Sequence, residues 1–190
     1  FLYRTQGLYE KAEPFFLRAL AIKEKALGPD HPETATSLNS LAVLYYKQGL
    51  YEKAKPLLLR ALAISEKALG PDHPDLSARL INLASFYSDQ GLYEKAEPLY
   101  LRALAISEKS LGRNHRITGT ILDNLGLVFD ERGLYEKAES FGLRALAIRE
   151  KALGPEHPDI ETSLPHLAWL YLRQGLDEKA ESLLLRALAI

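Results

Sequence analysis

Apolar and small residues recur along the chain with the spacing of buried helix faces. In residues 28–69, the apolar positions from Leu38 to Tyr45 follow the i, i+3, i+4, i+7 spacing of one buried face. After a turn at Gly49, a second helix begins near Tyr51, and apolar positions cover more than half of its circumference. A helix of that kind is wedged between two neighbours, so the pattern predicts an antiparallel helix pair. Its expected buried positions are Leu38, Leu41, Ala42 and Tyr45 on the first helix and Ala54, Leu57, Leu58, Ala61, Leu62, Ile64 and Ala68 on the second.

The pair is copied along the chain at a fixed interval of 42 residues, with its turn glycine at positions 7, 49, 91, 133 and 175. A fixed period of this size is typical of stacked supersecondary units. We therefore expect one all-α array, a right-handed α-solenoid of antiparallel helix pairs. Its units are residues 1–27 (partial), 28–69, 70–111, 112–153 and 154–190 (truncated). First helices are expected near 32–47, 74–89, 116–131 and 158–173, and second helices near 9–27, 51–69, 93–111, 135–153 and 177–190.

The helix ends carry their own signals. Gly28 followed by Pro29 ends one helix, because glycine tolerates the left-handed conformation there and proline cannot continue the helix. Asp30 stands three residues before Glu33, which resembles a capping box, and Pro32 falls in the first turn, where its missing N–H costs nothing. We therefore expect Asp30 to cap the next helix.

The run from Leu38 through Tyr45, Gly49 and Tyr51 to Ala61 resembles the tetratricopeptide repeat pattern. The longer period, with Leu-Gly-Pro-Asp-His-Pro between units, is similar to the kinesin light chain-like subclass of that family. The resemblance implies a noncatalytic protein–protein interaction scaffold that binds a peptide or an extended partner segment in its concave groove. The alternative is an architectural or self-associating segment, such as a sensor or spacer arm of a larger signalling protein, that stacks end to end.

Charge and composition exclude several classes of partner. The formal net charge is −1, with 24 basic and 25 acidic residues, so nucleic acid and an anionic membrane surface are not expected as partners. Each apolar run is interrupted by Arg or Lys and falls short of a membrane span. The absence of cysteine favours a cytoplasmic location.

No pattern of residues indicates a catalytic site, a cofactor site or a metal site. Four histidines share one repeat position, and their separation along the array favours a capping or inter-repeat hydrogen-bond role over a metal site. No phosphate-binding loop follows a strand, and no nucleophile has a base beside it. We therefore expect no enzyme activity, no catalytic residues, no cofactor and no metal. The four histidines are His31, His73, His115 and His157.

The informative residues are those that differ between copied units, since a scaffold conserves packing positions and varies contact positions. Asn82 and Asn124 lie one repeat apart, and paired side-chain amides can hold an extended peptide backbone. Aspartates and a glutamate make an acidic centre that favours a partner with a basic segment. The expected groove residues are Asn39, Ser40, Tyr46, Lys47, Asn82, Ser85, Asp89, Asp123, Asn124, Asp130, Glu131, His166, Trp169 and Arg173.

Two departures from the repeat and the chain ends complete the picture. Trp169 stands where other units have Val, Ser or Leu, and either a groove or a core position is open to it. Gly142 replaces a bulky residue and is expected to leave a thin spot in the packing. The chain opens and stops inside repeats, so we expect a piece of a longer array or end-to-end stacking through Phe1, Leu2, Leu184, Leu185 and Leu188.

Overall fold

The computed structural model describes residues 8–157, 160 and 163–190, and it divides into two compact units, Phe1–Gln90 and Gly91–Ile190. The boundary falls inside the predicted repeat 70–111. Within the described ranges all regular structure is helical. Unit 1 contains α2 (Tyr9–Leu27), α3 (Pro32–Lys47), α4 (Tyr51–Leu69) and α5 (Leu76–Ser88). Unit 2 contains α6 (Tyr93–Ser110), α7 (Arg116–Glu131), α8 (Tyr135–Leu153), α10 (Leu164–Arg173) and α11 (Asp177–Ala189).

The helix bounds follow the predicted ranges closely. The first helix predicted near 74–89 is observed as α5, Leu76–Ser88. The range predicted near 158–173 includes α10, Leu164–Arg173, while residues 158–159 and 161–162 lie outside the described part. No helix in the described ranges is long and apolar enough to cross a membrane.

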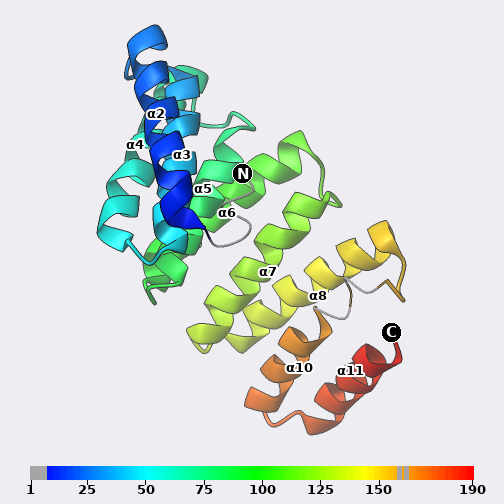
Figure 1. Ribbon diagram of the computed structural model, residues 1–190. Helices are drawn as coiled ribbons and strands as arrows, with labels where there is room; N and C mark the ends of the chain where they lie inside the picture. The colour runs from blue at the N-terminus through cyan, green and yellow to red at the C-terminus, as the bar shows by residue number, and fades with distance from the viewer. Residues whose placement is uncertain (1–7, 158–159, 161–162) are drawn as a thin grey trace. The chain divides into compact units, whose positions relative to one another are not determined.

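In unit 1, α3 packs between α2 and α4, and α4 also contacts α5 (Figure 1). Leu38 and Leu41 are buried, as predicted from the spacing, and Ala61 and Ile64 of α4 meet the α3 face. The prediction for Ala68 is wrong, because this residue is exposed. It lies in the last turn of α4, which has 19 residues against 16 in α3 and 13 in α5.

In unit 2, α7 packs against α6 and α8, and α10 packs against α8 and α11 (Figure 1). Ile121, Leu122 and Leu125 of α7 are fully buried. Gly126 of α7 faces α8, where a Cβ built on it would lie 3.4 Å from the carbonyl oxygen of Ala138, an ordinary van der Waals contact. The alanine that other repeats have at this position would therefore also fit here.

The turns after α3, α7 and α10 are Schellman motifs. Gly49 has φ +75°, a left-handed conformation that L side chains rarely adopt. Its N–H donates to the carbonyl of Tyr46 at 3.0 Å, and the Leu50 N–H donates to the carbonyl of Tyr45 at 2.9 Å. These bonds satisfy carbonyls that the end of α3 leaves free, and they direct the chain back into α4.

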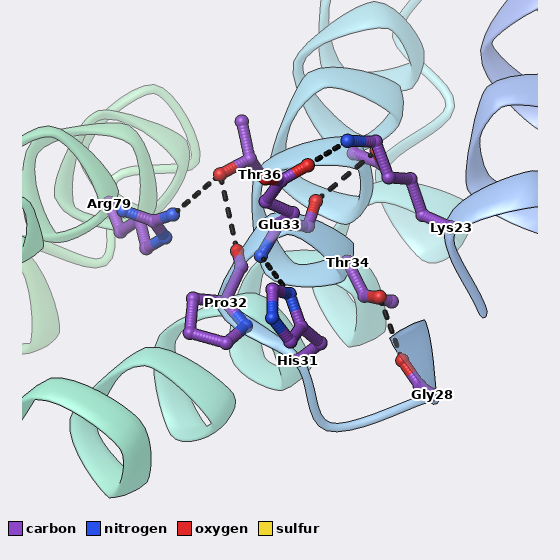
Figure 2. Close-up of polar contacts among 9 residues, drawn as sticks. Lys23, Gly28, His31, Pro32, Glu33, Thr34, Thr36 and Arg79 are labelled. Carbon is purple, nitrogen blue, oxygen red and sulfur yellow. Dashed lines mark hydrogen bonds and ion pairs between the residues drawn. The ribbon is translucent and has the colours of Figure 1, made fainter. Parts of the chain in front are cut away.

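The helix after the inter-repeat turn is capped by histidine, not by Asp30 as predicted. His31 has the extended conformation of an N-cap residue (φ −77°, ψ 143°), and its Nδ1 accepts the Glu33 N–H at 3.2 Å. Figure 2 shows this cap beside the Thr34 hydroxyl, which donates to the Gly28 carbonyl at 2.8 Å. Pro32 is the first helical residue, as predicted.

The capping role predicted for the histidines is confirmed for His31 and His115, the N-caps of α3 and α7, while His73 makes the same kind of bond in the turn that precedes α5. His73 Nδ1 accepts the Asp75 N–H at 3.2 Å, and His115 Nδ1 accepts the Ile117 N–H at 3.2 Å. Asp30 stands one residue too early to cap α3 and instead lies 3.6 Å from the Lys67 ammonium. The repeated histidine is therefore a structural residue of the inter-repeat turn.

A tyrosine in each unit joins a first helix to the preceding second helix. The Tyr45 hydroxyl donates to Glu13 at 2.8 Å, and the Tyr171 hydroxyl donates to Glu139 at 2.8 Å. Burial, followed by the hydrogen bond and the negative charge of the glutamate, raises the pKa of both Tyr45 and Tyr171 to about 12. This bond crosses from one repeat to the next and fixes their register.

Candidate functional site

On the first helices of unit 1, two predicted groove residues bond to each other. Asn82 of α5 donates through Nδ2 to Asn39 Oδ1 of α3 at 3.2 Å, and both side chains are half-buried. Each amide has two donor hydrogens and an acceptor oxygen, so one mutual bond leaves most of this capacity unused. The pair links adjacent repeats and still offers polar groups at the surface.

Other predicted groove residues of unit 1 surround an aromatic cluster. The ring of Tyr46 lies 6.3 Å from that of Tyr51 and 6.0 Å from that of Phe86. The Tyr46 hydroxyl donates to the Asp89 carboxylate, and the Lys47 ammonium lies 5.2 Å from the Tyr46 ring centre. Ser40, by contrast, donates its hydroxyl to its own helix, at the Thr36 carbonyl. Ser85 is half-buried on α5.

Sequence reasoning missed Arg79 in this unit. Its guanidinium donates to the Asp75 carbonyl at 2.8 Å. It also reaches across to α3, where it donates to the Thr36 hydroxyl at 3.0 Å (Figure 2). Burial lowers the pKa of Arg79, and the charge of Asp75 opposes that shift. The sequence does mark Arg79 as a departure from the repeat, because the other repeats have Ser37, Ile121 and Ser163 at this position.

In unit 2, the predicted acidic centre is largely neutralised by the chain's own arginines. Arg149 of α8 binds both carboxylate oxygens of Asp123 and donates to the Ser163 hydroxyl at 2.7 Å. Burial raises the pKa of Asp123, against the hydrogen bond and charge of Arg149 and the charge of His166. The signal that sequence reasoning missed is Arg149 itself, which stands where Ser65 and Ser107 are buried in other repeats.

Asp130 was expected to be an exposed groove residue, but it is buried, with only 7% of its surface exposed. Arg173 Nη1 lies 3.0 Å from its Oδ1. The two side chains therefore form an ion pair between α7 and α10. Burial raises the pKa of Asp130, and the charge and hydrogen bond of Arg173 oppose that shift. The expectation of an unpaired acidic centre is therefore corrected, and Glu131 remains its exposed carboxylate.

A small pocket opens between α7, α8 and α10, within unit 2. Its volume is about 30 Å³, and glycines on two helices form part of its wall. Leu167 fills part of the space that Gly142 leaves, since a Cβ at Gly142 would lie 2.7 Å from Leu167 Cδ2. The thin spot predicted at Gly142 is thus partly repacked and partly a pocket. Its lining residues are Asp123, Gly126, Leu127, Asp130, Ala138, Gly142, Ser163, His166, Leu167 and Leu170.

Trp169 is a surface residue, not part of the core, with 62% of its surface exposed. Leu127, at the same repeat position on α7, is 41% exposed. Asn124 is half-buried and His166 is exposed. Asn82 belongs to unit 1 and Asn124 to unit 2, so each is described within its own unit. The first helices of unit 2 therefore expose apolar, polar and charged groups together.

Comparison with known proteins agrees with this geometry. A family model described as tetratricopeptide repeat matches residues 1–67, 40–85, 76–151 and 131–190. BtubC (BKLC) of P. vanneervenii is similar over 98% of this chain and 74% of its own, with 26% identity and a TM-score of 0.86. A putative kinesin light chain of Podosopora anserina with nearly identical TPR-like repeats covers 98% of this chain and 89% of its own, with 29% identity and a TM-score of 0.84.

A more distant solved structure, MamA, shares the fold at 21% identity and a TM-score of 0.69, covering 98% of this chain and 91% of its own. No curated protein matches the sequence significantly. The family model covers every repeat, and the helix pairs have the expected α-solenoid fold. The chain therefore belongs to the tetratricopeptide repeat family, and kinesin light chain-like proteins are among its structural neighbours.

Proposed function

We propose that the chain is a noncatalytic protein–protein interaction scaffold that holds an extended partner segment along its first helices. The observation that carries this proposal is the exposure of Trp169 and Leu127 at one repeat position, 62% and 41%. Residues at packing positions of the same helices, such as Leu125 and Leu167, are buried. Exposed aromatic and aliphatic groups beside polar ones are the composition of a binding surface.

Unit 1 supports the same role with different chemistry. The Asn39 and Asn82 side chains keep donors and acceptors for a peptide backbone after bonding each other. Tyr46, packed beside Tyr51, supplies a ring and a hydroxyl next to the Asp89 carboxylate. Unit 1 therefore offers polar groups to an extended segment, while unit 2, taken by itself, offers apolar ones.

The partner segment carries a basic residue in this proposal, but the contacts differ from those expected from sequence. Asp123 and Asp130 already face Arg149 and Arg173. Asp89, just after α5, and Glu131 of α7 are exposed carboxylates. A surface lysine or arginine of the partner pairs with these two groups and adds specificity more than affinity.

The test is selection of random peptides by display on the immobilised chain, followed by affinity measurement on variants. Leu127→Ala and Leu143→Ala form a matched pair, since both leucines are about equally exposed, 41% and 43%, on a first and a second helix respectively. We expect Leu127→Ala and Trp169→Ala to weaken selected peptides about tenfold or more, and Leu143→Ala to leave them unchanged.

Two results contradict the proposal. Selected peptides that bind Leu127→Ala and Trp169→Ala as tightly as the parent chain place the ligand elsewhere. Peptides that are lost on Leu143→Ala alone place it on the second helices. Thermal unfolding of each variant separates loss of contact from loss of fold.

A second candidate function, self-association, is favoured by the surface of α11. Leu188 is 84% exposed, whereas Leu62, Leu104 and Leu146 at the same position are 6–8% exposed. Leu184 is also exposed, and Phe1 and Leu2 lie outside the described residues. Analytical ultracentrifugation of the parent chain and of Leu188→Glu tests it. A concentration-dependent oligomer that Leu188→Glu abolishes supports stacking, and a monomer at all concentrations contradicts it.

A further inference from the structure

The first turns of α3 and α7 are each held by a histidine cap. The Nδ1 atom of His31 accepts the Glu33 N–H, and that of His115 accepts the Ile117 N–H, both at 3.2 Å. Each helix begins at the residue directly after its histidine. Both histidines therefore stand where the orphan N–H groups of a helix start need an acceptor.

A buried threonine is a second tie on the same turns. The Thr34 hydroxyl donates to the Gly28 carbonyl at 2.8 Å, and the Thr118 hydroxyl donates to the Gly112 carbonyl at 3.0 Å. Both threonines are fully buried, and Figure 2 shows the first of them beside the His31 cap. The first turn of α3 and the first turn of α7 therefore each depend on two side chains.

The start of α5 shows the turn with only one of these ties. His73 bonds the Asp75 N–H, but Leu76 stands at the repeat position of Thr34 and has no hydroxyl. No side chain caps α5, and this helix begins at Leu76. The position of Leu76 corresponds to the third residue of α3. One tie alone therefore does not keep the first turn helical.

The histidine tie depends on the protonation state of the ring. An imidazole accepts at Nδ1 only when it is neutral and its proton is on Nε2, because the protonated ring has donors on both nitrogens. Histidine takes up this proton within the range of about pH 8 to pH 5. A positive ring is also unfavourable at a helix N-terminus, which carries partial positive charge. Protonation therefore removes the cap.

Charged groups surround both caps, and the acids among them are paired with bases. The pairs around His31 join α2, the turn, α3 and α4, and they are Lys23–Glu33, Arg60–Glu24 and Lys67–Asp30. Around His115 the pair is Arg144–Glu108, with Arg113, Arg116 and Lys151 as further bases. On the α5 side of α3, Arg79 bonds Thr36 (Figure 2). Because these acids are engaged, a protonated histidine does not exchange its cap for an ion pair with them.

We propose that His31 and His115 are pH-dependent caps, which hold the first turns of α3 and α7 closed when neutral and release them when protonated. The capped chain resists proton uptake at both rings, so it binds fewer protons than the unfolded chain in mildly acidic solution. The stability that the caps contribute is therefore complete above neutral pH and is lost as the pH falls. In acid, α3 and α7 start later, as α5 does. The chain thus has one acid-sensitive turn in each unit.

Nitrogen-15 NMR of the full chain between about pH 8 and about pH 5 tests this proposal. At the upper end, the rings of His31 and His115 are expected as the Nε2–H tautomer. The Ala35 and Gly119 amides report the first turns, since they donate to the carbonyls of the two histidines at 3.1 Å. As the rings gain protons, we expect the protection of these amides from hydrogen exchange to fall about fivefold, as for loss of one N-cap.

Asparagine variants separate the caps from the other titrating groups. His31→Asn and His115→Asn, combined in one chain, supply a good N-cap whose side chain does not titrate in this range. The Ala35 and Gly119 amides of this double variant are expected to keep their protection at the acidic end. His166→Asn removes an exposed histidine of α10 and is expected to leave the pH dependence of the parent chain unchanged.

Four results overturn the proposal. The first is an Nδ1–H tautomer of either capping ring at about pH 8. The second is unchanged protection of the Ala35 and Gly119 amides while the rings titrate. The third is a pH dependence that survives in the double asparagine variant, which assigns it to carboxylates. The fourth is an equal loss of protection at a buried helix-centre amide such as that of Leu41, which indicates unfolding of the whole unit and not of its first turn.

Discussion

The tyrosine that joins successive repeats gives a quantitative prediction, in which Tyr45→Phe is destabilising at neutral pH and stabilising at high pH. The substitution removes the hydroxyl that donates to Glu13 and keeps the buried ring. Because Glu13 is half-exposed and gains water in exchange, we expect a loss of about 1 kcal/mol in the free energy of unfolding near pH 7.

The pH dependence follows from the raised pKa of Tyr45, about 12 against an ordinary 10. Between these values the unfolded chain loses the phenolic proton while the folded chain keeps it. The native state then binds more protons, so stability falls as pH rises. A shift of two pKa units corresponds to about 2.7 kcal/mol in total, of which about 2.3 kcal/mol is lost by pH 12. Tyr45→Phe lacks this term, so the order of stability of variant and parent reverses near pH 11.

Urea unfolding followed by far-UV circular dichroism, at about pH 8 and about pH 11.5, measures both differences. Tyr171→Phe, which removes the equivalent bond to Glu139 in unit 2, is expected to behave in the same way. Tyr51→Phe removes a hydroxyl from a residue that is 40% exposed, and it is expected to be neutral near pH 8. A stability difference for Tyr45→Phe that stays constant with pH refutes the reasoning.

Three further predictions follow from the turns and the buried carboxylates. His31→Ala should cost about 1 kcal/mol in chemical unfolding through loss of the N-cap of α3, whereas Asp30→Ala, at the cap predicted from sequence, should change stability by less than about 0.5 kcal/mol. Gly49→Ala should cost about 1–2 kcal/mol because φ is +75° there, and Gly126→Ala, in a helix, should show no such loss in thermal unfolding. Burial raises the pKa of Asp130, so its stabilising contribution is present below its ordinary pKa and is lost as pH rises through the raised value; an acid-range stability profile that is the same in Asp130→Asn contradicts this.

The fold was predictable because the same pattern of packing and turn residues is repeated along the sequence. Four copies of the pattern around Leu38, Gly49 and Ala61 separate packing positions, which recur, from surface positions, which vary. Helix bounds and core followed from this redundancy. The cap was misplaced because Asp30 and His31 are adjacent and either side chain can accept a backbone N–H. Only the extended backbone of His31 decides between them.

The candidate site was less predictable, since ion pairs depend on side-chain reach between helices and not on spacing within one helix. The spacing placed Asp123 and Asp130 on a first helix correctly. It did not show that Arg149, from the second helix of the same repeat, reaches Asp123. The exposure of Trp169 was likewise undecided by sequence, because a tryptophan at that position suits either a core or a surface.

The departures from the repeat become informative when they are considered together. A buried position in an array is constrained by both neighbours, so a change there needs compensation nearby. Arg149, in place of a buried serine, is compensated by Asp123 and Ser163, and Gly142 is partly compensated by Leu167. Both changes are on α8, and the residues that compensate for them, Asp123, Ser163 and Leu167, line the same pocket. The repeated residues are sufficient for packing, as the other repeats show. The exceptions gather around this pocket, which therefore has polar and charged lining residues that the other repeats lack.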